Sequence, residues 1–386
     1  MSDKAILTVN AGSSSIKFSV YEPDSLREMV SGQVDSLNPN RQTSLTIKAL
    51  DTGNTVRENI TANDHAGAFS DVLRHSEMLF GKRTVAGVGH RVVHGGIKHD
   101  KPALLEDAVL TELAKLEPLA PLHQPHNLAG VRAASKAFPN AVQVGCFDTA
   151  FHRTHPWVND TFALPRKYYN EGVRRYGFHG LSYDYISGHL AETEPDLAEG
   201  RFIVCHLGNG ASMCAIRGGK SVGSTMGFSA LDGLPMGTRC GQLDPGVLLY
   251  LMDKGMDARE IENLLYKDSG LKGLSGISND MRDLEASDDP AAKQAIDYFV
   301  FRIRREIGGM ASVLGGLDGL IFCGGIGENS AHVRRKVCKD MDWLGIEIDK
   351  VSNADNAREI GTGKARVMVV PTDEEIVIAR AVKARL

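Results

Sequence analysis

The sequence predicts a mixed α/β protein of two domains, and three observations support this prediction. Apolar runs of strand length alternate with stretches in which apolar residues recur at helical spacing. The chain has 386 residues, of which 42% are hydrophobic, and this length exceeds that of one typical domain. A pattern of apolar strand, Gly/Ser/Asn turn and returning strand occurs twice, roughly two hundred residues apart. A repeat of half-chain length indicates two similar domains.

The first copy of this pattern opens the chain. Residues 5–9 and 16–20 are apolar and predict the two strands of a β-hairpin, with Gly12 and three serines at 13–15 in the turn. Backbone N–H groups and hydroxyls at such a turn suit a phosphate, and Lys17 adds a positive charge. For this stretch alone, a plain hairpin with a hydrophilic turn is the structural alternative.

The rest of the first half continues the alternation of elements. The predicted elements are, in order, strand-like pieces such as 44–50 within a polar region at 24–64, a helix at 66–80, a strand at 85–93, a helix at 126–138 and a strand at 141–147. Gly95 and Gly96 mark a turn after the strand predicted at 85–93, at the end where α/β proteins place ligands. Asp148 follows the second strand, where an Asp either caps a turn or takes part in chemistry.

The second half contains the second copy of the pattern, with strands at 202–205 and 213–216 around a turn at 206–212. A helix begins at Ser182. Strands are expected at 318–323 and 366–370. A long helix is predicted at 290–314 because one helical stripe is apolar, formed by Ala292, Ile296, Phe299, Ile303, Ile307, Met310 and Leu314.

The last helix is predicted to begin with a capping box. In this interpretation the side chains of Thr372 and Glu375 bond to each other's backbone N–H groups. The side chain of Glu374 is then left to point elsewhere.

A connector rich in Pro and aromatic residues at 155–169 indicates a domain boundary close to it. With the last helix assigned to the first domain, we expect an N-terminal subdomain of residues 1–151 plus 373–386. We expect residues 152–372 to form the C-terminal subdomain. We expect a hinge in the connector and in the link before Pro371.

Composition and charge exclude several classes of function. A net charge of −4 argues against non-specific nucleic-acid binding. No uninterrupted apolar run reaches the ~20 residues of a membrane span, and the first residues lead into a strand with no signal peptide. The six cysteines form no Cys-x-x-Cys pair, and three of them lie in apolar runs as small core residues, which favours a reducing cytoplasm. We therefore expect a cytoplasmic protein that binds neither nucleic acid nor membrane.

Common nucleotide-binding motifs are missing. The nearest approach to a Walker A loop is Gly219-Lys220-Ser221, but Cys214 stands where the first Gly should be, and the stretch predicts a hairpin turn. No Gly-x-Gly-x-x-Gly opens a helix. Phosphate binding is therefore expected from the two hairpins and from residues 324–329.

Histidines occur in close pairs, which are His90/His94, His123/His126 and His152/His155. A zinc site needs three or four ligands in one place. We therefore favour core or loop positions for most of these histidines over a zinc-dependent hydrolase.

Polar and mostly cationic residues lie in Gly-bounded turns after strand-like or aromatic runs. They are Arg91, His179, Asn209 and Arg239. Each one alone is better explained as a solvated loop residue. Together they fit a site that neutralises a transferring phosphoryl group.

Nine short motifs, in order along essentially the whole chain, resemble those of the acetokinase family within the sugar-kinase/Hsp70/actin superfamily. They are NAGSSSIK at 10–17, GHRVVHGG at 89–96, APLH at 120–123, FDTAFH at 147–152, YGFHG at 176–180, CHLGNG at 205–210, MGTRCG at 236–241, GGIGEN at 324–329 and PTDEE at 371–375. Several of these motifs are weak singly, but the ordered set is specific.

This resemblance implies an α/β fold of two duplicated actin-like (ribonuclease H-like) domains with a cleft between them. It implies a kinase that transfers a phosphoryl group reversibly from ATP to acetate, giving acetyl phosphate and ADP. It also implies Mg²⁺, with Mn²⁺ as a substitute, and a cytoplasmic homodimer.

The resemblance also implies roles for individual residues. Asn10 and Glu374 would form the magnesium site, and Asp148 would be an essential acid. Arg91 would hold the substrate carboxylate or its phosphate. His179 and Arg239 would stabilise the transition state. The apolar pocket for the methyl group would consist of Val93, Leu122 and Phe178. Nucleotide binding is assigned to Lys17, His206, Leu207, Gly208, Asn209, Gly210, Asp280, Met281, Arg282, Gly325, Ile326, Gly327, Glu328 and Asn329.

Two residues bear on the choice of acid. Ala230 stands where family members often carry Pro, and its smaller size leaves more room for propionate. Val93 favours acetate, because propionate kinases tend to have a smaller residue there. A propionate (short-chain fatty acid) kinase is therefore the alternative. A nucleotide-gated binding protein of the actin or Hsp70 kind is a third hypothesis, but it has no use for Arg91 and Arg239.

The chemistry predicts a role for Asp148 that differs from a general base. Acetate is ionised near neutral pH, because carboxylic acids have pKa values of about 4 to 5. The nucleophile therefore needs no deprotonation, and the difficulty lies in bringing two anions together. We expect Asp148 to orient Arg91 or a metal-bound water, although the family's conventional label for it is acid/base.

Overall fold

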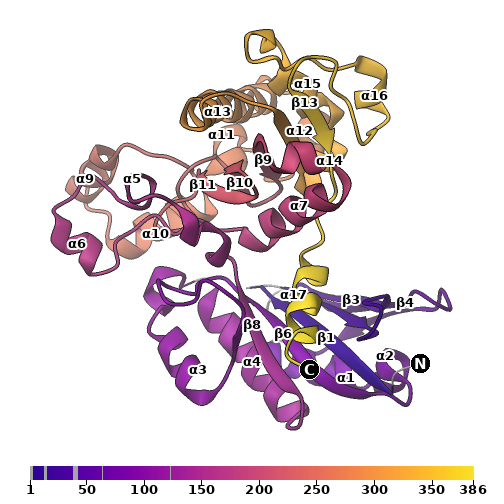
Figure 1. Cartoon of the computed structure of the whole chain (residues 1–386). Helices are drawn as coiled ribbons and strands as arrows, with labels where there is room; N and C mark the ends of the chain where they lie inside the picture. The colour runs from indigo at the N-terminus through magenta and orange to yellow at the C-terminus, as the bar shows by residue number, and fades with distance from the viewer. Residues whose placement is uncertain (1–2, 13–14, 38–41, 63, 122) are drawn as a thin grey trace. The chain divides into compact units, whose positions relative to one another are not determined.

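The computed structural model of the chain describes residues 3–12, 15–37, 42–62, 64–121 and 123–386 (Figure 1). The chain divides into two compact units, each with its own β-sheet. Unit 1 contains Met1–Phe151 and Asp373–Leu386, and unit 2 contains His152–Thr372. The fold is mixed α/β, as predicted.

Unit 1 is built on an eight-stranded sheet in the order β5-β4-β3-β2-β1-β6-β8-β7. Its strands are β1 (Lys4–Ala11), β2 (Ser15–Tyr21), β3 (Glu28–Asp35), β4 (Thr43–Ala49), β5 (Thr55–Ile60), β6 (Thr84–Val92), β7 (Ala103–Leu104) and β8 (Val142–Phe147). Strands β1 and β2 form the predicted antiparallel hairpin, while β1, β6 and β8 run parallel. Only scattered strand-like pieces were predicted at 24–64, whereas this region supplies three antiparallel strands, β3 to β5.

The helices of unit 1 are α1 (His65–Leu73), α2 (Ser76–Phe80), α3 (Asp107–Ala114), η1 (Glu117–Leu119), α4 (Gln124–Ala137) and α17 (Glu374–Lys383). The helix predicted at 66–80 is divided into α1 and α2. In Figure 1, α17 lies over β1 and β6, although it comes from the far end of the chain. Gly87 and Gly89 permit this close approach, because a Cβ on either residue would lie within 2.4 Å of Val382 or Ile378.

Unit 2 is built on a five-stranded sheet in the order β11-β10-β9-β12-β13. Its strands are β9 (Arg201–Leu207), β10 (Ala211–Arg217), β11 (Lys220–Ser224), β12 (Gly319–Cys323) and β13 (Arg366–Val369). The predicted second hairpin is confirmed as the antiparallel pair β9 and β10. Lys220 pairs with Arg217 across a hairpin turn, so the stretch that approaches a Walker A loop is a β-turn, as expected.

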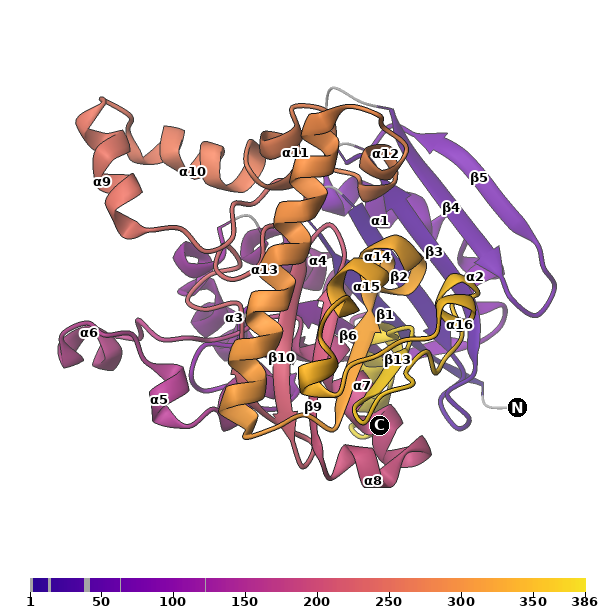
Figure 2. The same ribbon diagram turned by 90° about the horizontal axis from the view of Figure 1, so that it is seen from above.

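Unit 2 also contains both long and short helices. They are α5 (Trp157–Asp160), α6 (Arg166–Asn170), α7 (Gly180–Thr193), α8 (Pro195–Ala198), α9 (Pro245–Asp253), α10 (Ala258–Lys267), α11 (Gly270–Ser275), α12 (Met281–Glu285), α13 (Pro290–Leu314), α14 (Gly324–Asn329), α15 (Ala331–Cys338), η3 (Asp342–Leu344) and α16 (Lys350–Ala354). The long helix α13 has the predicted bounds, and its whole predicted apolar stripe is buried. Figure 2 shows it running across β9 and β10, which it contacts.

The predicted capping box of the last helix is wrong. Asp373 is the N-cap of α17, and its carboxylate accepts a hydrogen bond from the Ile376 N–H. Thr372 belongs to unit 2, where its hydroxyl is hydrogen-bonded to Ser182 at 2.8 Å. The carboxylate of Glu374 does not cap the helix, as predicted, although the predicted capping box is absent.

The connector at 155–169 is part of unit 2 rather than a link between the units. The Arg175 N–H donates to the Asp160 carbonyl at 2.9 Å, and Asn159 bonds to the Val222 carbonyl. The chain passes between the units at Phe151–His152, within the short helix η2 (Ala150–Thr154), and at Thr372–Asp373. Across the described part of the chain, no helix combines the length and apolar character that a membrane crossing requires.

Candidate active site

Arg91 and Asp148 form a bidentate ion pair in unit 1. Arg91 lies near the end of β6, and Asp148 directly follows the neighbouring parallel strand β8. Arg91 Nε donates to both carboxylate oxygens at 3.0 and 3.1 Å, and Nη2 donates to Oδ2 at 2.7 Å. Asp148 is only 1% exposed, so little solvent screens the pair. Burial would lower the pKa of Arg91, but the carboxylates of Asp148 and Glu374 raise it overall and keep the guanidinium charged.

Asn10 and Glu374 approach the same guanidinium. Arg91 Nη1 lies 3.5 Å from Asn10 Oδ1 and 3.6 Å from Glu374 Oε2. Strand β1, the ends of β6 and β8 and the first turn of α17 thus bring together four residues that the sequence predicted. Mg²⁺ in nucleotide sites takes one or two protein oxygens and completes its shell with water and phosphate. An amide oxygen and a carboxylate in this position fit such an ion.

Two buried amide side chains on α4 hold the strand ends of this site, and the sequence analysis missed both. Asn127 Oδ1 accepts from the Val93 N–H at 2.9 Å, and its Nδ2 donates to the Ala11 carbonyl at 2.6 Å. Gln124 Oε1 accepts from the His94 N–H at 3.1 Å, and its Nε2 donates to the His94 carbonyl at 3.0 Å. Both amides lie on one face at the start of α4, and this spacing was visible in the sequence.

The other predicted site residues of unit 1 are Lys17, Val93 and Leu122. Lys17 is exposed on β2 and pairs in register with Asn10. Burial and the neighbouring Glu374 raise the pKa of Glu375, and the charge of Lys17 partly offsets this effect. Val93 is buried directly after β6. Leu122 lies outside the described residues.

Two histidines of unit 2 stack on each other beside the β9–β10 turn. The ring centroids of His179 and His206 are 4.3 Å apart. His179 Nδ1 is hydrogen-bonded to Ser212 Oγ, and His206 Nδ1 to Ser182 Oγ, each at 2.8 Å. His179 has a φ of +56°, a left-handed conformation that residues other than Gly rarely adopt. Such strain is often found at functional sites, and here it precedes the first turn of α7.

Arg239 approaches the same turn. A Cβ at Gly210 would lie 3.4 Å from His179 Nε2 and 3.9 Å from Arg239 Nη1, so this imidazole and guanidinium both reach the turn. Arg239 Nη1 also donates to the Ala230 carbonyl at 3.3 Å. Phe178 is buried immediately before His179. The two predicted transition-state residues therefore meet within unit 2.

A pocket of about 560 Å³ opens beside these residues in unit 2. It is lined by Gly208, Asn209, Asn279, Asp280, Met281, Arg282, Glu285, Gly325, Ile326, Asn329 and Ser330. The lining contains eight of the predicted nucleotide-binding residues and three that the sequence analysis missed, namely Asn279, Glu285 and Ser330. Asp280 caps α12 and holds Arg282 through two hydrogen bonds, of 3.0 and 2.6 Å.

The remaining residues of the predicted nucleotide set do not line this pocket. Leu207 and Gly327 are buried. Glu328 Oε1 accepts from the Gly324 N–H at 2.8 Å and from the Thr372 N–H at 3.3 Å, so its carboxylate supports the backbone. Gly324 has a φ of +75°, and a Cβ there would lie 2.8 Å from the Leu207 carbonyl oxygen, so this position requires Gly.

The paired histidines are largely structural. His90 is buried and bonds to Gln143 at 2.8 Å, while His152 and His155 both bond to the hydroxyl of Ser221, at 2.9 and 2.8 Å. Burial lowers the pKa of His90 and His152 to about 4 and that of His155 to about 2. In the ranges that the structure describes, no three His, Cys, Asp or Glu side chains gather as a metal cluster.

Known proteins resemble this chain over nearly its whole length. The sequence is 54% identical to the acetate kinase of Methylocella silvestris over 398 aligned residues, which cover 99% of this chain and 98% of that protein. The crystal structure of Porphyromonas gingivalis acetate kinase matches with a TM-score of 0.89 at 37% identity, covering 99% of both chains. A propionate kinase from Francisella tularensis matches with a TM-score of 0.91 at 35% identity, also covering 99% of both chains.

The model of the acetokinase family matches residues 5–380. The match spans both units and includes every predicted site residue. This chain belongs to the acetokinase family.

Proposed function

We propose that the protein transfers the γ-phosphoryl group of ATP to acetate directly and in line, in a reversible, Mg²⁺-dependent reaction that gives acetyl phosphate and ADP. The observation that carries this proposal is the Arg91–Asp148 pair, with Asn10 and Glu374 at the same guanidinium. This arrangement suits an anionic acceptor and an adjacent metal–phosphate complex. The similarity to the acetate kinases of Methylocella silvestris and Porphyromonas gingivalis supports the same activity.

Arg91 is the group that would bind the acetate carboxylate and then the acyl phosphate. Its charge is secured by Asp148, and the bidentate geometry fixes the plane of the guanidinium. Acetate is already ionised near pH 7, so no side chain has to remove a proton from it. We infer that Asp148 is a positioning residue that acts through Arg91, rather than a general base.

Asn10 and Glu374 would hold Mg²⁺, with Mn²⁺ as a substitute. When bound, the ion would neutralise phosphate charge in the transition state. The chain's own part is to supply one amide oxygen and one carboxylate and to keep them in place. Buried amides on α4 and the cap of α17 by Asp373 do this.

In unit 2, His179 and Arg239 would stabilise charge on the transferring group, because both reach the β9–β10 turn. The 560 Å³ pocket would take the nucleotide. Its apolar residues Met281 and Ile326 and the flat guanidinium of Arg282 suit a purine base. The proposal requires both sets of residues to act on one phosphoryl group.

The second candidate is a propionate kinase. The similarity to the Francisella tularensis propionate kinase favours it, as does the small side chain of Ala230 beside Arg239. Val93 favours acetate.

Trapping of the acyl phosphate with hydroxylamine, in the presence of ATP and Mg²⁺, compares kcat/KM for acetate, propionate and butyrate. We expect acetate to be preferred. Propionate used equally well would favour the second candidate, and no acyl phosphate from any acid would overturn the proposal.

A cytoplasmic homodimer completes the proposal. Helix α9 has no buried residue and exposes Leu249, Tyr250 and Met252 by 64%, 58% and 52%. Exposed apolar side chains in such number mark a contact surface, and a second copy of the chain is the expected partner. Light scattering during gel filtration should give twice the 41.8 kDa of one chain. The monomer mass at micromolar concentration would contradict this part of the proposal.

A further inference from the structure

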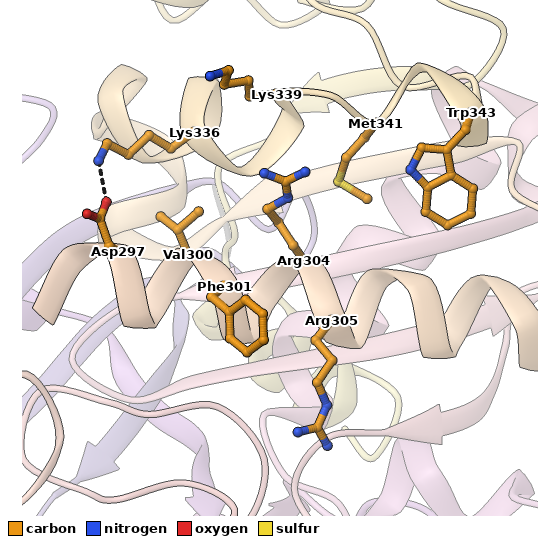
Figure 3. A pocket seen from close by; sticks show the side chains of 9 residues that line it. All are labelled: Asp297, Val300, Phe301, Arg304, Arg305, Lys336, Lys339, Met341 and Trp343. Carbon is orange, nitrogen blue, oxygen red and sulfur yellow. Dashed lines mark hydrogen bonds and ion pairs between the residues drawn. The ribbon is translucent and has the colours of Figure 1, made fainter. Parts of the chain in front are cut away.

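A second pocket of unit 2 shares no lining residue with the proposed nucleotide pocket. Its volume is about 680 Å³, and it lies between α13, α15 and η3. Figure 3 shows side chains of α13 along one side, Lys336 and Lys339 on the other, and Met341 and Trp343 at one end. None of these residues has a part in the reaction proposed above.

Arg304 is the central cation of this pocket. It is half-buried on α13, and within the described residues no hydrogen bond or ion pair engages its guanidinium. In Figure 3 the guanidinium rises from the helix toward Lys339 and Met341. The adjacent Arg305 points the other way, and its Nη2 donates to Gln242 at 2.6 Å. A half-buried guanidinium without a partner is a donor group ready for an anion.

Cationic side chains outnumber carboxylates around Arg304. Lys336 is bonded to Asp297 at 2.5 Å, and Lys339 is 72% exposed, with its nearest carboxylate, Asp340, at 4.0 Å. Asp297 and Asp340 partly neutralise Lys336 and Lys339, so Arg304 is the cation of this group whose charge no carboxylate of the described residues balances. A phosphate monoester carries close to two negative charges near neutral pH, because its second pKa is about 6. Arg304 and the two partly neutralised lysines would face this charge together.

Aromatic and apolar side chains occupy the rest of the wall. Trp343 and Phe301 are 68% and 61% exposed, which is unusual for such large side chains, and Met341 forms a buried floor at 2% exposure. An exposed indole at one end of a pocket with a cationic centre suits a ligand with a flat apolar body and an anionic group at one end.

From this arrangement we infer a binding site for a small aromatic phosphate monoester. Its phosphate lies against Arg304, with Lys336 and Lys339 beside it, and its ring lies against Trp343. The site is separate from the nucleotide pocket, and its existence does not depend on the proposed function.

The test uses the tryptophan of the pocket as a reporter. The chain has two tryptophans, and Trp157 is the other one, so the full-length Trp157→Phe variant isolates the emission of Trp343. This variant is titrated with phenyl phosphate, with inorganic phosphate and with phenol. We expect a saturable change with phenyl phosphate, weaker binding of inorganic phosphate, and a loss of affinity as salt is added.

Two matched variants assign the signal to the site. Arg304→Met should weaken phenyl phosphate binding by about tenfold to a hundredfold, the usual effect of losing hydrogen bonds to a charged group. Arg305→Met removes a neighbouring guanidinium that points elsewhere, and it should leave the affinity unchanged. Equal melting temperatures of the two variants would show that both are folded.

Several outcomes would overturn the inference. These are a linear, non-saturating response to phenyl phosphate, equal affinity for inorganic phosphate, or equal effects of the two arginine variants. A change in Trp343 emission on dilution of the protein, with none on addition of phenyl phosphate, would also overturn it and would indicate that a second copy of the chain covers this face.

Discussion

Asp148 accepts three hydrogen bonds from Arg91 and is almost completely buried. A general base must instead present a lone pair to the proton that it removes. The geometry therefore favours a positioning role, and the chemistry agrees, because an acetate anion has no proton to lose.

Replacement of Asp148 by Asn tests this role. The variant keeps an acceptor but removes the charge, so we expect kcat/KM for acetate to fall by about tenfold to a hundredfold. The pH–rate profile should keep its shape. Loss of one limb of the profile in the variant would instead assign proton transfer to Asp148.

A matched control exists in unit 2. Arg201 and Asp318 also form a bidentate pair, with hydrogen bonds of 2.9 and 2.7 Å, but away from the candidate site. Asp318→Asn should leave the kinetic constants unchanged. This comparison separates a general loss of an ion pair from an effect on Arg91.

Glu374 provides a second test at the level of one residue. Glu374→Gln removes a carboxylate ligand of the proposed magnesium site and leaves the cap of α17, Asp373, in place. We expect the Mg²⁺ concentration for half-maximal activity to rise by about tenfold, with much of the rate restored at high Mg²⁺. An unchanged Mg²⁺ dependence would remove Glu374 from the metal site.

The start of α17 was predicted only in part from the sequence. The motif predicted that the carboxylate of Glu374 is not used as a helix cap, and this is confirmed, but the residue assumed to be the cap was wrong. Thr372 and Asp373 are both good N-caps by type. Only the tertiary partner of Thr372, the hydroxyl of Ser182, decides between them.

At the level of elements, α15 is held to α14 by a buried arginine. Arg334 is fully buried and donates to the carbonyls of Gly327 and Glu328 at 2.8 and 2.9 Å. It also donates to Asn353 Oδ1 at 2.8 Å and to the Asn353 carbonyl at 2.7 Å. Helix α14 supplies Gly325, Ile326 and Asn329 to the pocket that we propose for the nucleotide, so Arg334 fixes one wall of that pocket.

Arg334→Met should therefore weaken ADP binding and lower the stability by about 3 kcal/mol or more, because it leaves several buried carbonyls without a donor. Calorimetric titration and thermal unfolding measure the two effects. Arg335, the next residue, is exposed and bonds only to His332 among the described residues, so Arg335→Met should change neither quantity. Equal ADP affinity in both variants would contradict the role of Arg334.

Elements with strong periodicity were predicted most accurately. The bounds of α13 follow from one apolar stripe and a Pro at its start, and both hairpins follow from apolar runs around small-residue turns. Strands β3 to β5 were predicted poorly because many of their residues are polar. Their assignment depends on neighbouring strands in the sheet, which a single stretch of sequence does not reveal.

At the scale of the whole molecule, buried histidines link stability to pH. The pKa of His90 is lowered by burial to about 4 in the folded chain, against about 6.5 when unfolded. The unfolded chain therefore binds more protons as the pH falls below about 6.5, and stability must fall with it. His152 and His155 act in the same direction.

We expect the melting temperature to fall as the pH is lowered from about 6.5 to about 5, with about 1.4 kcal/mol lost per pH unit for each fully buried neutral histidine. Thermal unfolding of His90→Asn over the same range should show a shallower dependence, whatever its absolute stability. An identical slope in the variant would show that folding does not lower the pKa of His90.

The central claim concerns phosphoryl transfer to a carboxylate, and ³¹P NMR of the purified chain with ATP, Mg²⁺ and acetate tests it most directly. We expect acetyl phosphate and ADP to appear together, and added ADP and acetyl phosphate to regenerate ATP. Release of inorganic phosphate from ATP, with no acetyl phosphate in either direction, would exclude phosphoryl transfer to acetate.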